Sequence, residues 1–375
     1  MNLADSGWSP YFEALFNDIA QDGWVPARVS LQHRTKYRVI AAAGELDATT
    51  TGRMRHTAEY SSSLPAVGDW VAIAARPDEG AATIHAILPR RSKFSRKAVH
   101  SGGMPETGGR TDEQVMAANI DTVFLVSGLD LDFNLRRIER YVSAAWDSGA
   151  TAVVVLNKAD LCENAQARAD EVTAAIVGVE VCIVSAAIGD GVDRIEAYLG
   201  AGKTVALLGS SGVGKSSIIN RLLGEERIAT NEVRDWDNRG RHTTTHRELI
   251  LLPQGGVVID TPGLREILGW STEEGLNAVF GDIEELATRC RFRDCRHGGE
   301  PGCAIEAALA SGDLDAKRWK NYIELQQQAA MLSRRKDQRA RRQADKDFSL
   351  RIGSFMREYN KLNKNGALGR KLKRD

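Results

Sequence analysis

The segment GSSGVGKS, residues 209–216, has the residue types and spacing needed to bind the phosphates of a nucleotide. It matches G-x-x-x-x-G-K-[ST] and lies between an apolar run and a helical pattern, which is the context that this motif requires. Glycines let backbone N–H groups turn toward phosphate oxygens, and the following helix adds its positive end. We expect Lys215 to reach the β and γ phosphates and Ser216 to ligate Mg²⁺. The expected phosphate-binding residues are Gly209, Ser210, Ser211, Gly212, Val213, Gly214, Lys215, Ser216 and Ser217.

Further residues along the chain could complete the magnesium site and sense the γ phosphate. Asp260 ends the apolar run VVID and can hold the ion through water, while the backbone N–H of Gly263 in DTPG can contact the γ phosphate. The loop RHTTTH lies between the two motifs, and one of its threonines should ligate Mg²⁺ in the triphosphate state. The spacing to the next expected strand favours Thr244, with Thr243 and Thr245 as alternatives.

The tetrapeptide NKAD, residues 157–160, has the residue types that recognise a guanine base. Asp160 can accept two hydrogen bonds from the N1 and N2 groups of guanine, which adenine cannot offer. Asn157 can bond the O6 or N7 edge, and the stem of Lys158 can cover the ring. Ser185 and Ala186, in the segment VSAA, could place a backbone N–H on O6. Because adenine would leave such polar groups unpaired, the pattern favours GTP over ATP.

The N-terminus lacks a basic start followed by an apolar run, so we expect no secretion signal and a cytoplasmic location. No window of about 18 consecutive apolar residues occurs, so we expect no membrane span. The composition is that of an ordinary soluble protein, with 42% hydrophobic and 27% charged residues.

Three of the five cysteines lie close together with a histidine, in the spacing C-x₄-C-x-H-x₅-C. In a cytosolic chain such a cluster indicates a metal site before a disulfide. Three thiolates and one imidazole fill a tetrahedral zinc site and leave no open position, which predicts a structural ion. The expected ligands are Cys290, Cys295, His297 and Cys303. Four arginines in or beside this loop could bind an RNA backbone, namely Arg289, Arg291, Arg293 and Arg296.

These motifs need a scaffold that brings loops distant in sequence to one edge. From residue 120, apolar runs alternate with helical patterns, which predicts an α/β domain with a parallel sheet covered on both faces. Residues 26–90 hold short alternating runs, which favour a small β-barrel but also fit a sandwich. The segment SPYFEALF predicts a short helix with Ser9 as its cap and Pro10 at its first position. The apolar spacing over 319–332 predicts a long helix.

The motifs occur in the order guanine motif (NKAD), S-A loop (VSAA, residues 184–187), phosphate loop (GSSGVGKS), threonine loop (RHTTTH, residues 241–246) and DTPG. An ordinary small GTPase begins with its phosphate loop. The order in this chain is that of a circularly permuted GTPase. More narrowly, the chain resembles the bacterial family of small-ribosomal-subunit-dependent, circularly permuted GTPases that act in ribosome biogenesis. The segments GSSGVGKSS, GRHTTTH, DTPGLRE and VGDWV and the cysteine cluster carry the resemblance, which spans about residues 26 to 335.

The resemblance implies an RNA-binding barrel of the OB type and strengthens the expectation of zinc. It also implies binding to the small (30S) ribosomal subunit and its 16S rRNA in the GTP state. Ribosome-stimulated hydrolysis to GDP and phosphate would then release the protein late in subunit maturation. Because the permutation ties DTPG directly to the metal region, we hypothesise that hydrolysis acts on that region.

Hydrolysis requires a group that orients the attacking water. Many GTPases carry a glutamine just after D-x-x-G, but Leu264 occupies that position and cannot hydrogen-bond. We therefore expect slow intrinsic turnover that a partner accelerates. His242, in the threonine loop, is the candidate for orienting water, and the resemblance points the same way. The alternative is that His242 is an ordinary surface histidine.

The zero net charge hides an asymmetry along the chain. Residues 317–375 carry 18 Lys and Arg against 6 Asp and Glu, so the rest carries 32 against 44. A basic arm on an acidic body suggests a polyanionic partner, although a solvated helical tail fits as well. Two other functions stay open: an RNA-binding scaffold that uses nucleotide only for stability, and a GTP-dependent RNA-modifying enzyme. We expect a monomer.

The chain is thus expected to be multidomain, with an OB-type barrel, a permuted α/β P-loop GTPase and a zinc-binding helical domain. The expected divisions are an N-terminal extension (1–25), the barrel (26–90), a linker (91–118), the GTPase domain (119–275), the zinc-binding domain (276–335) and a basic tail (336–375).

Overall fold

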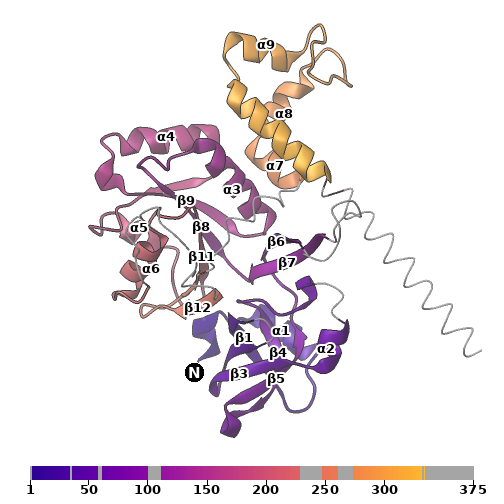
Figure 1. The fold of residues 1–375 in the computed structure, drawn as a ribbon, viewed down its shortest axis with the longest axis vertical. Helices are drawn as coiled ribbons and strands as arrows, with labels where there is room; N and C mark the ends of the chain where they lie inside the picture. The colour runs from indigo at the N-terminus through magenta and orange to yellow at the C-terminus, as the bar shows by residue number, and fades with distance from the viewer. Residues whose placement is uncertain are drawn as a thin grey trace, which may run out of the picture.

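A computed structural model describes residues 2–33, 36–57, 61–99, 111–228, 247–260, 273–331 and 333. Several residues singled out above lie outside these ranges: His242, Thr244, Gly263 and Leu264, together with the basic tail. Figure 1 shows the barrel at one end, the sheet of the expected GTPase domain (called the GTPase sheet below) in the middle, and α7–α9 with the last described helix at the other end.

The strands are β1 (Trp24–Gln32), β2 (Tyr37–Ala41), β3 (Gly44–Thr50), β4 (Trp70–Arg76), β5 (Ala81–Ile87), β6 (Lys93–Val99), β7 (Thr111–Ala118), β8 (Thr122–Gly128), β9 (Thr151–Asn157), β10 (Glu180–Ile183), β11 (Thr204–Leu208), β12 (Arg247–Leu251) and β13 (Val257–Asp260). The helices are α1 (Pro10–Asn17), α2 (Gly52–Thr57), α3 (Leu135–Asp147), α4 (Ala165–Ala175), α5 (Val192–Glu196), α6 (Lys215–Leu223), α7 (Glu273–Val279), α8 (Gly281–Thr288) and α9 (Ala304–Ser311). Residues 316–331 form a further helix, called the C-terminal helix below, which confirms the long helix expected there.

The N-terminal strands close into a five-stranded barrel. Their order is β1-β2-β3-β5-β4, and β4 pairs back with β1. The β3–β5 pair is parallel and the others are antiparallel, which is the OB arrangement. Val29, Val39, Ile73 and Ile84 fill the interior and are fully buried. The barrel prediction is confirmed, and the β4–β1 pairing excludes the sandwich that alternation alone allowed.

The GTPase sheet has the order β10-β9-β8-β11-β13-β12, in which only β12 is antiparallel to its neighbour. Alternate residues of its strands face opposite sides. Val123 and Leu125 pack with α3 and α4, whereas Phe124 and Val126 pack with α5 and α6. The predicted parallel sheet with helices on both faces is confirmed, and its apolar runs reflect burial on both sides.

A strand pairing and a buried arginine join the barrel to the GTPase sheet. Strand β12 pairs with β1, which places Leu31 opposite Glu248. The guanidinium of Arg28 is fully buried and donates to the carbonyls of Gly68 at 3.2 Å and Asn119 at 3.1 Å, and also to Ser6. Burial lowers the pKa of Arg28 to about 10. One cation therefore links the N-terminal turn, the barrel and the start of the GTPase fold.

Helix α1 begins at Pro10 with Ser9 in the cap position, as predicted, but the Ser9 hydroxyl makes no hydrogen bond. The helix is fixed by packing instead, because Phe12 and Phe16 bury against Trp70 on the barrel. The predicted helix is therefore confirmed, whereas tertiary contact takes the place of the expected side-chain cap.

The C-terminal helices share one core with the GTPase fold. Phe280, Ile305 and Leu325 belong to the same buried cluster as Ile138 and Val142 of α3. The two parts are also joined by hydrogen bonds. The buried carboxylate of Glu139 on α3 accepts from Arg136 at 2.6 Å and from Asn321 of the C-terminal helix at 3.0 Å. The metal region is thus packed firmly on α3.

Replacing Asp69 with alanine should lower the free energy of unfolding by about 3–5 kcal/mol, because it leaves the Arg90 guanidinium largely buried without its carboxylate. The fully buried Asp69 accepts from both Nε and Nη2 of Arg90, each at 2.7 Å. Denaturant titration measures the loss. As a control, Asp47→Ala removes a carboxylate that is 82% exposed and 3.6 Å from Arg38, and should change stability by less than about 1 kcal/mol. A similar small loss for Asp69→Ala would contradict this account.

Candidate nucleotide site and metal centre

The expected phosphate loop connects β11 to α6, so it lies at the carboxyl end of a central strand. Two of its glycines are required by close packing. A Cβ on Gly209 would lie 2.2 Å from the carbonyl oxygen of Val126, and one on Gly214 would lie 2.2 Å from the Asn157 amide nitrogen. Gly214 also has φ 94°, a left-handed conformation that side chains disfavour. At these two positions the loop backbone therefore packs directly against β8 and against the guanine motif.

Lys215 is the first residue of α6, and its ammonium group lies back over the loop. Its Nζ donates to the carbonyl oxygens of Gly209 at 2.9 Å and Ser210 at 2.5 Å. The positive charge and the N-terminus of α6 are thus at the same place, which favours a phosphate group there.

Asn157 connects the guanine motif to both neighbouring loops. Its side chain is buried, its Nδ2 donates to the carbonyl of Val213 at 2.8 Å, and its Oδ1 accepts from the Ala186 N–H at 3.0 Å. One side chain therefore holds the phosphate loop and the S-A loop in register. The pattern NKAD predicts contact with the base, but it did not reveal this connecting role.

The other guanine-motif residues are also positioned by specific partners. Lys158 adopts a left-handed conformation with φ 65°, and its Nζ lies 2.6 Å from the Asp130 carboxylate after β8. Burial raises the pKa of the Asp130 carboxyl, but the hydrogen bond and the charge of Lys158 outweigh this effect, so the pKa is lowered. Asp160 accepts a hydrogen bond from the hydroxyl of Ser185. The structure thus brings the guanine motif and the S-A loop together.

Arg221 of α6 was not singled out by sequence patterns, yet it holds the S-A loop. Its Nη2 donates to the carbonyl of Ala187 at 2.7 Å and its Nε to that of Ala186 at 3.2 Å. The helix that follows the phosphate loop therefore also positions the loop expected to face the base. No local pattern indicates this contact, because 35 residues separate Arg221 from Ala186.

Asp260 lies at the end of β13, opposite Glu248 of β12. Burial raises the pKa of its carboxyl, the charge of Lys215 opposes that rise, and Glu248 adds to it. The charge of Lys215 in the phosphate loop therefore acts on the Asp260 carboxylate. A divalent cation would offset the cost of burying this charge, so the site fits the Mg²⁺ that accompanies GTP.

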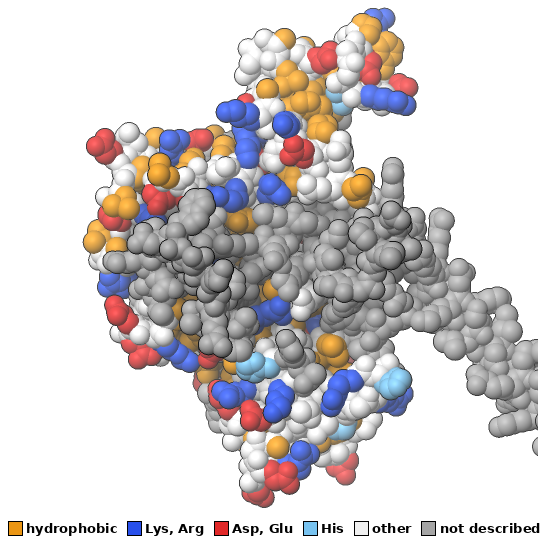
Figure 2. Space-filling view, viewed as in Figure 1, with side chains coloured by type: hydrophobic (Ala, Val, Ile, Leu, Met, Phe, Trp, Pro, Cys, Tyr) orange, Lys and Arg blue, Asp and Glu red, His pale blue; other side chains and the backbone are white. Residues whose placement is uncertain are grey.

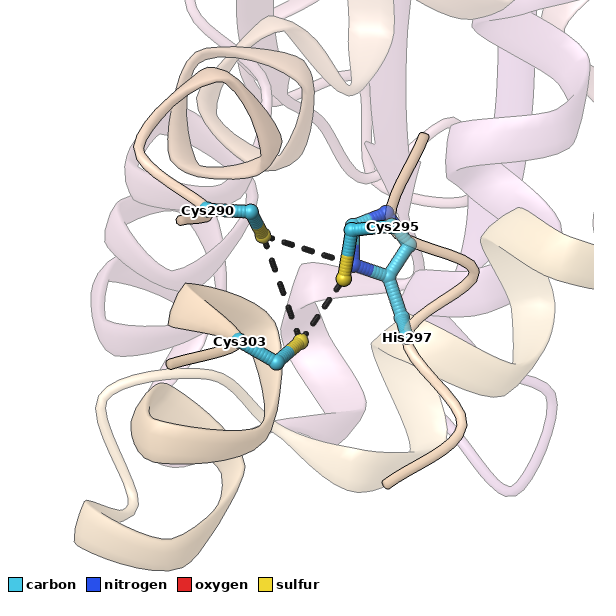
Figure 3. Close-up of side chains that lie close together, drawn as sticks. All are labelled: Cys290, Cys295, His297 and Cys303. Carbon is cyan, nitrogen blue, oxygen red and sulfur yellow. Dashed lines mark hydrogen bonds between the residues drawn. The ribbon is translucent and has the colours of Figure 1, made fainter. Parts of the chain in front are cut away.

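The predicted metal ligands come together in a tight cluster between α8 and α9 (Figure 3). Their ligand atoms all lie within 4.8 Å of one another. The Nδ1 of His297 is 3.6 Å from the sulfur of Cys290 and 3.4 Å from that of Cys303. Three sulfurs and one ring nitrogen that face one common point fit a four-coordinate metal ion.

Backbone N–H groups donate to sulfurs of the cluster, and their effect on the thiols differs: the N–H of His297 lowers the pKa of Cys295, but desolvation and the two neighbouring sulfurs raise it, to about 11. The N–H of Ala304 donates to the Cys290 sulfur at 3.3 Å, and that of Glu306 donates to Cys303 at 3.5 Å. Desolvation of Cys290 is outweighed by donors including Ala304, so the pKa of this thiol is lowered. The indole of Trp319 lies edge-on to the His297 ring, with 5.6 Å between centroids, and ties the cluster to the C-terminal helix. The four neighbouring arginines, at positions 289, 291, 293 and 296, are exposed.

Comparison with known proteins identifies the family. Residues 87–270 match the family model described as RsgA GTPase. A protein of Opitutus terrae named small ribosomal subunit biogenesis GTPase RsgA is 49% identical over 346 residues, which cover 90% of this chain and 92% of that protein. The chain belongs to the RsgA GTPase family. A relative of the same name from Syntrophotalea carbinolica is 45% identical and covers 86% of this chain and 88% of its own length. This RsgA-family chain is accordingly a GTPase.

Two solved structures share the fold. YjeQ from Thermotoga maritima aligns with a TM-score of 0.57 at 24% identity, covering 82% of this chain and 99% of that chain. YloQ, described as a circularly permuted GTPase, aligns with a TM-score of 0.54 at 22% identity, covering 83% of this chain and 97% of that chain. These matches confirm the permuted fold that the motif order predicts. In the part of the chain that the structure describes, no helix combines the length and the apolar character needed to cross a membrane.

Proposed function

We propose that this GTPase binds the small ribosomal subunit and its 16S rRNA in the GTP state, and that subunit-stimulated hydrolysis releases it late in subunit maturation. The observation that carries the proposal is the extended similarity, 49% identity over 90% of the chain, to a relative named for small-subunit biogenesis. The arrangement of Asn157, which connects the phosphate and S-A loops, supports GTP as the nucleotide.

The proposed roles combine the geometry of the described loops with the sequence motifs. Gly209 to Ser217 cradle the phosphates, Ser216 and Asp260 hold Mg²⁺ with Thr244, and Gly263 senses the γ phosphate. Asp160 reads the guanine edge, beside the ring-covering Lys158 and the S-A loop. In the cysteine cluster we propose one structural Zn²⁺, because three thiolates and an imidazole leave no coordination position open. The exposed arginines around that ion would contact rRNA phosphates.

His242→Ala should lower the subunit-stimulated kcat by about 10²-fold while GTP binding is retained, because His242 is proposed to orient the attacking water. Single-turnover hydrolysis with saturating small subunits measures this step. His246→Ala, at the other end of the same threonine run, is the matched control and should keep the stimulated rate. If His242→Ala hydrolysed GTP as fast as the unmodified protein, the role would be excluded.

The direct test of the proposed function is steady-state GTP hydrolysis by the full chain, measured alone, with small subunits and with large subunits. We expect slow turnover alone and a large increase with small subunits only. Equal rates in all three conditions would overturn the proposed stimulation by the small subunit, and no turnover in any of them would favour a scaffold whose nucleotide site only stabilises the fold.

A further inference from the structure

A groove of about 430 Å³ lies between the N-terminal part of α3 and the C-terminal helix. Cationic side chains dominate its lining: Arg136, Arg137 and Arg140 from α3, and Lys317 and Lys320 from the C-terminal helix, against the single carboxylate of Glu324. Figure 2 shows Lys and Arg side chains gathered where the C-terminal helices meet the GTPase part.

Part of this positive charge is not neutralised within the described structure. Arg136 pairs with Glu139, and Arg137 lies 2.7 Å from Asp132. By contrast, no carboxylate of the described residues pairs with Arg140 or Lys317, and Lys320 is 4.0 Å from Glu324. The Nε of Arg140 is moreover buried without a hydrogen-bond partner. Unpaired cations together with a donor that lacks an acceptor favour a ligand rich in anionic acceptors.

The walls of the groove are held at a fixed spacing by the network beneath it. The buried carboxylate of Glu139 on α3 accepts from Asn321 at 3.0 Å and lies 3.5 Å from the Nε of Arg318. Arg318 in turn contacts Asp282 at 2.8 Å. The two helices that carry the cations are therefore held in place, and a ligand that contacts both walls does not have to bring them together first.

We propose that this groove binds the phosphodiester backbone of RNA. The lining consists of Arg, Lys, Asn and Glu side chains, with no aromatic or aliphatic residue to anchor a protein partner or stack a base. Several donors at fixed spacing suit successive phosphates and carry no sequence information. The proposal rests on the proposed function, because the RNA would be that of the small subunit. It adds a contact that spans the GTPase fold and the C-terminal helix.

The test replaces Arg140 and Lys317 together with glutamine in the full chain and compares binding to small subunits, with a non-hydrolysable GTP analogue, across a range of salt concentrations. We expect roughly tenfold weaker binding and a fall of about 1.5 in the slope of log affinity against log salt, because two phosphate contacts are lost. Intrinsic GTP hydrolysis should be unchanged. The control removes two other exposed arginines, Arg168 on α4 and Arg194 on α5, by the same substitution, and should retain both affinity and slope.

The outcomes separate the two proposals. If the unmodified protein binds small subunits and the double variant binds with the same affinity and slope, the groove proposal is overturned while the proposed function stands. If the unmodified protein fails to bind small subunits, the proposed function is wrong. The groove is then tested by binding to purified 16S rRNA, where we expect the double variant to show the same fall in the slope of log affinity against log salt. A variant that loses small-subunit binding but keeps its affinity and slope for purified 16S rRNA would assign the groove to a ribosomal protein instead, which also overturns the proposal.

Discussion

Replacing Lys215 with alanine should lower kcat/KM for GTP by on the order of 10²–10³ or more, with the fold intact. The ammonium group of Lys215 lies over the loop between Gly209 and Ser210, at the N-terminus of α6. Removing it takes away the one cation of the segment 209–216 that can stabilise charge developing on the β and γ phosphates. Stopped-flow binding of a fluorescent GTP analogue would measure the loss of nucleotide binding, and phosphate release would measure the loss of hydrolysis.

Lys203→Ala is the matched control for this experiment. Lys203 is exposed and directly precedes β11, so it lies at the opposite end of the strand that leads into the phosphate loop. Its removal should leave kcat/KM for GTP within about twofold of the unmodified value, since surface changes away from a site have small effects. Equal activity of the Lys215 and Lys203 variants would show that the segment 209–216 is not the phosphate site.

The second large effect is expected at the metal centre. Cys303→Ser should reduce bound metal from one ion per chain to none and unfold the segment from α8 to the C-terminal helix. Metal binding in small structural zinc sites contributes about 10–16 kcal/mol, and we expect the packing of this region on α3 to be too small to replace it. The serine retains the cap of α9, because Cys303 occupies the N-cap and its sulfur accepts from Glu306. A loss of structure would therefore report the missing ligand and not a missing cap.

Metal analysis and hydrogen exchange together measure this effect. Amides of residues 281–331 should lose protection in Cys303→Ser, and those of α3 should lose part of theirs, because Ile138 and Leu325 share one core. Cys182→Ala, which removes a buried thiol from β10 outside the cluster, should keep one ion per chain. Full metal content and unchanged exchange in Cys303→Ser would contradict the assignment of this residue as a ligand.

Sequence patterns predicted the features that depend on local spacing. The phosphate loop and the cysteine cluster each occupy one short segment, and the alternation of apolar strands with helices is set by the pattern within each successive segment, so residue types and distances along the chain were sufficient. Motif order predicted the permuted fold for a similar reason. Each motif marks the end of one strand, and strand ends meet at one edge of a parallel sheet.

The contacts that sequence reasoning missed join segments distant along the chain. The pairing of Asp69 with Arg90 spans 21 residues, the link from Arg28 to Asn119 spans 91, and that from Glu139 to Asn321 spans 182. An isolated arginine or glutamate carries no local signal of such a partner. The same reason explains the roles of Arg221 and Asp130 beside the guanine motif. Barrel closure likewise depends on the pairing of β4 with β1, which alternation of residues does not encode.

The central claim is that the nucleotide state of this GTPase controls its association with the small ribosomal subunit. Co-sedimentation of the full chain with purified small subunits tests it most directly, in parallel samples that contain GDP or a non-hydrolysable GTP analogue. The account predicts that the protein sediments with the subunits in the analogue sample and stays in the supernatant with GDP. Equal sedimentation in both samples would contradict it.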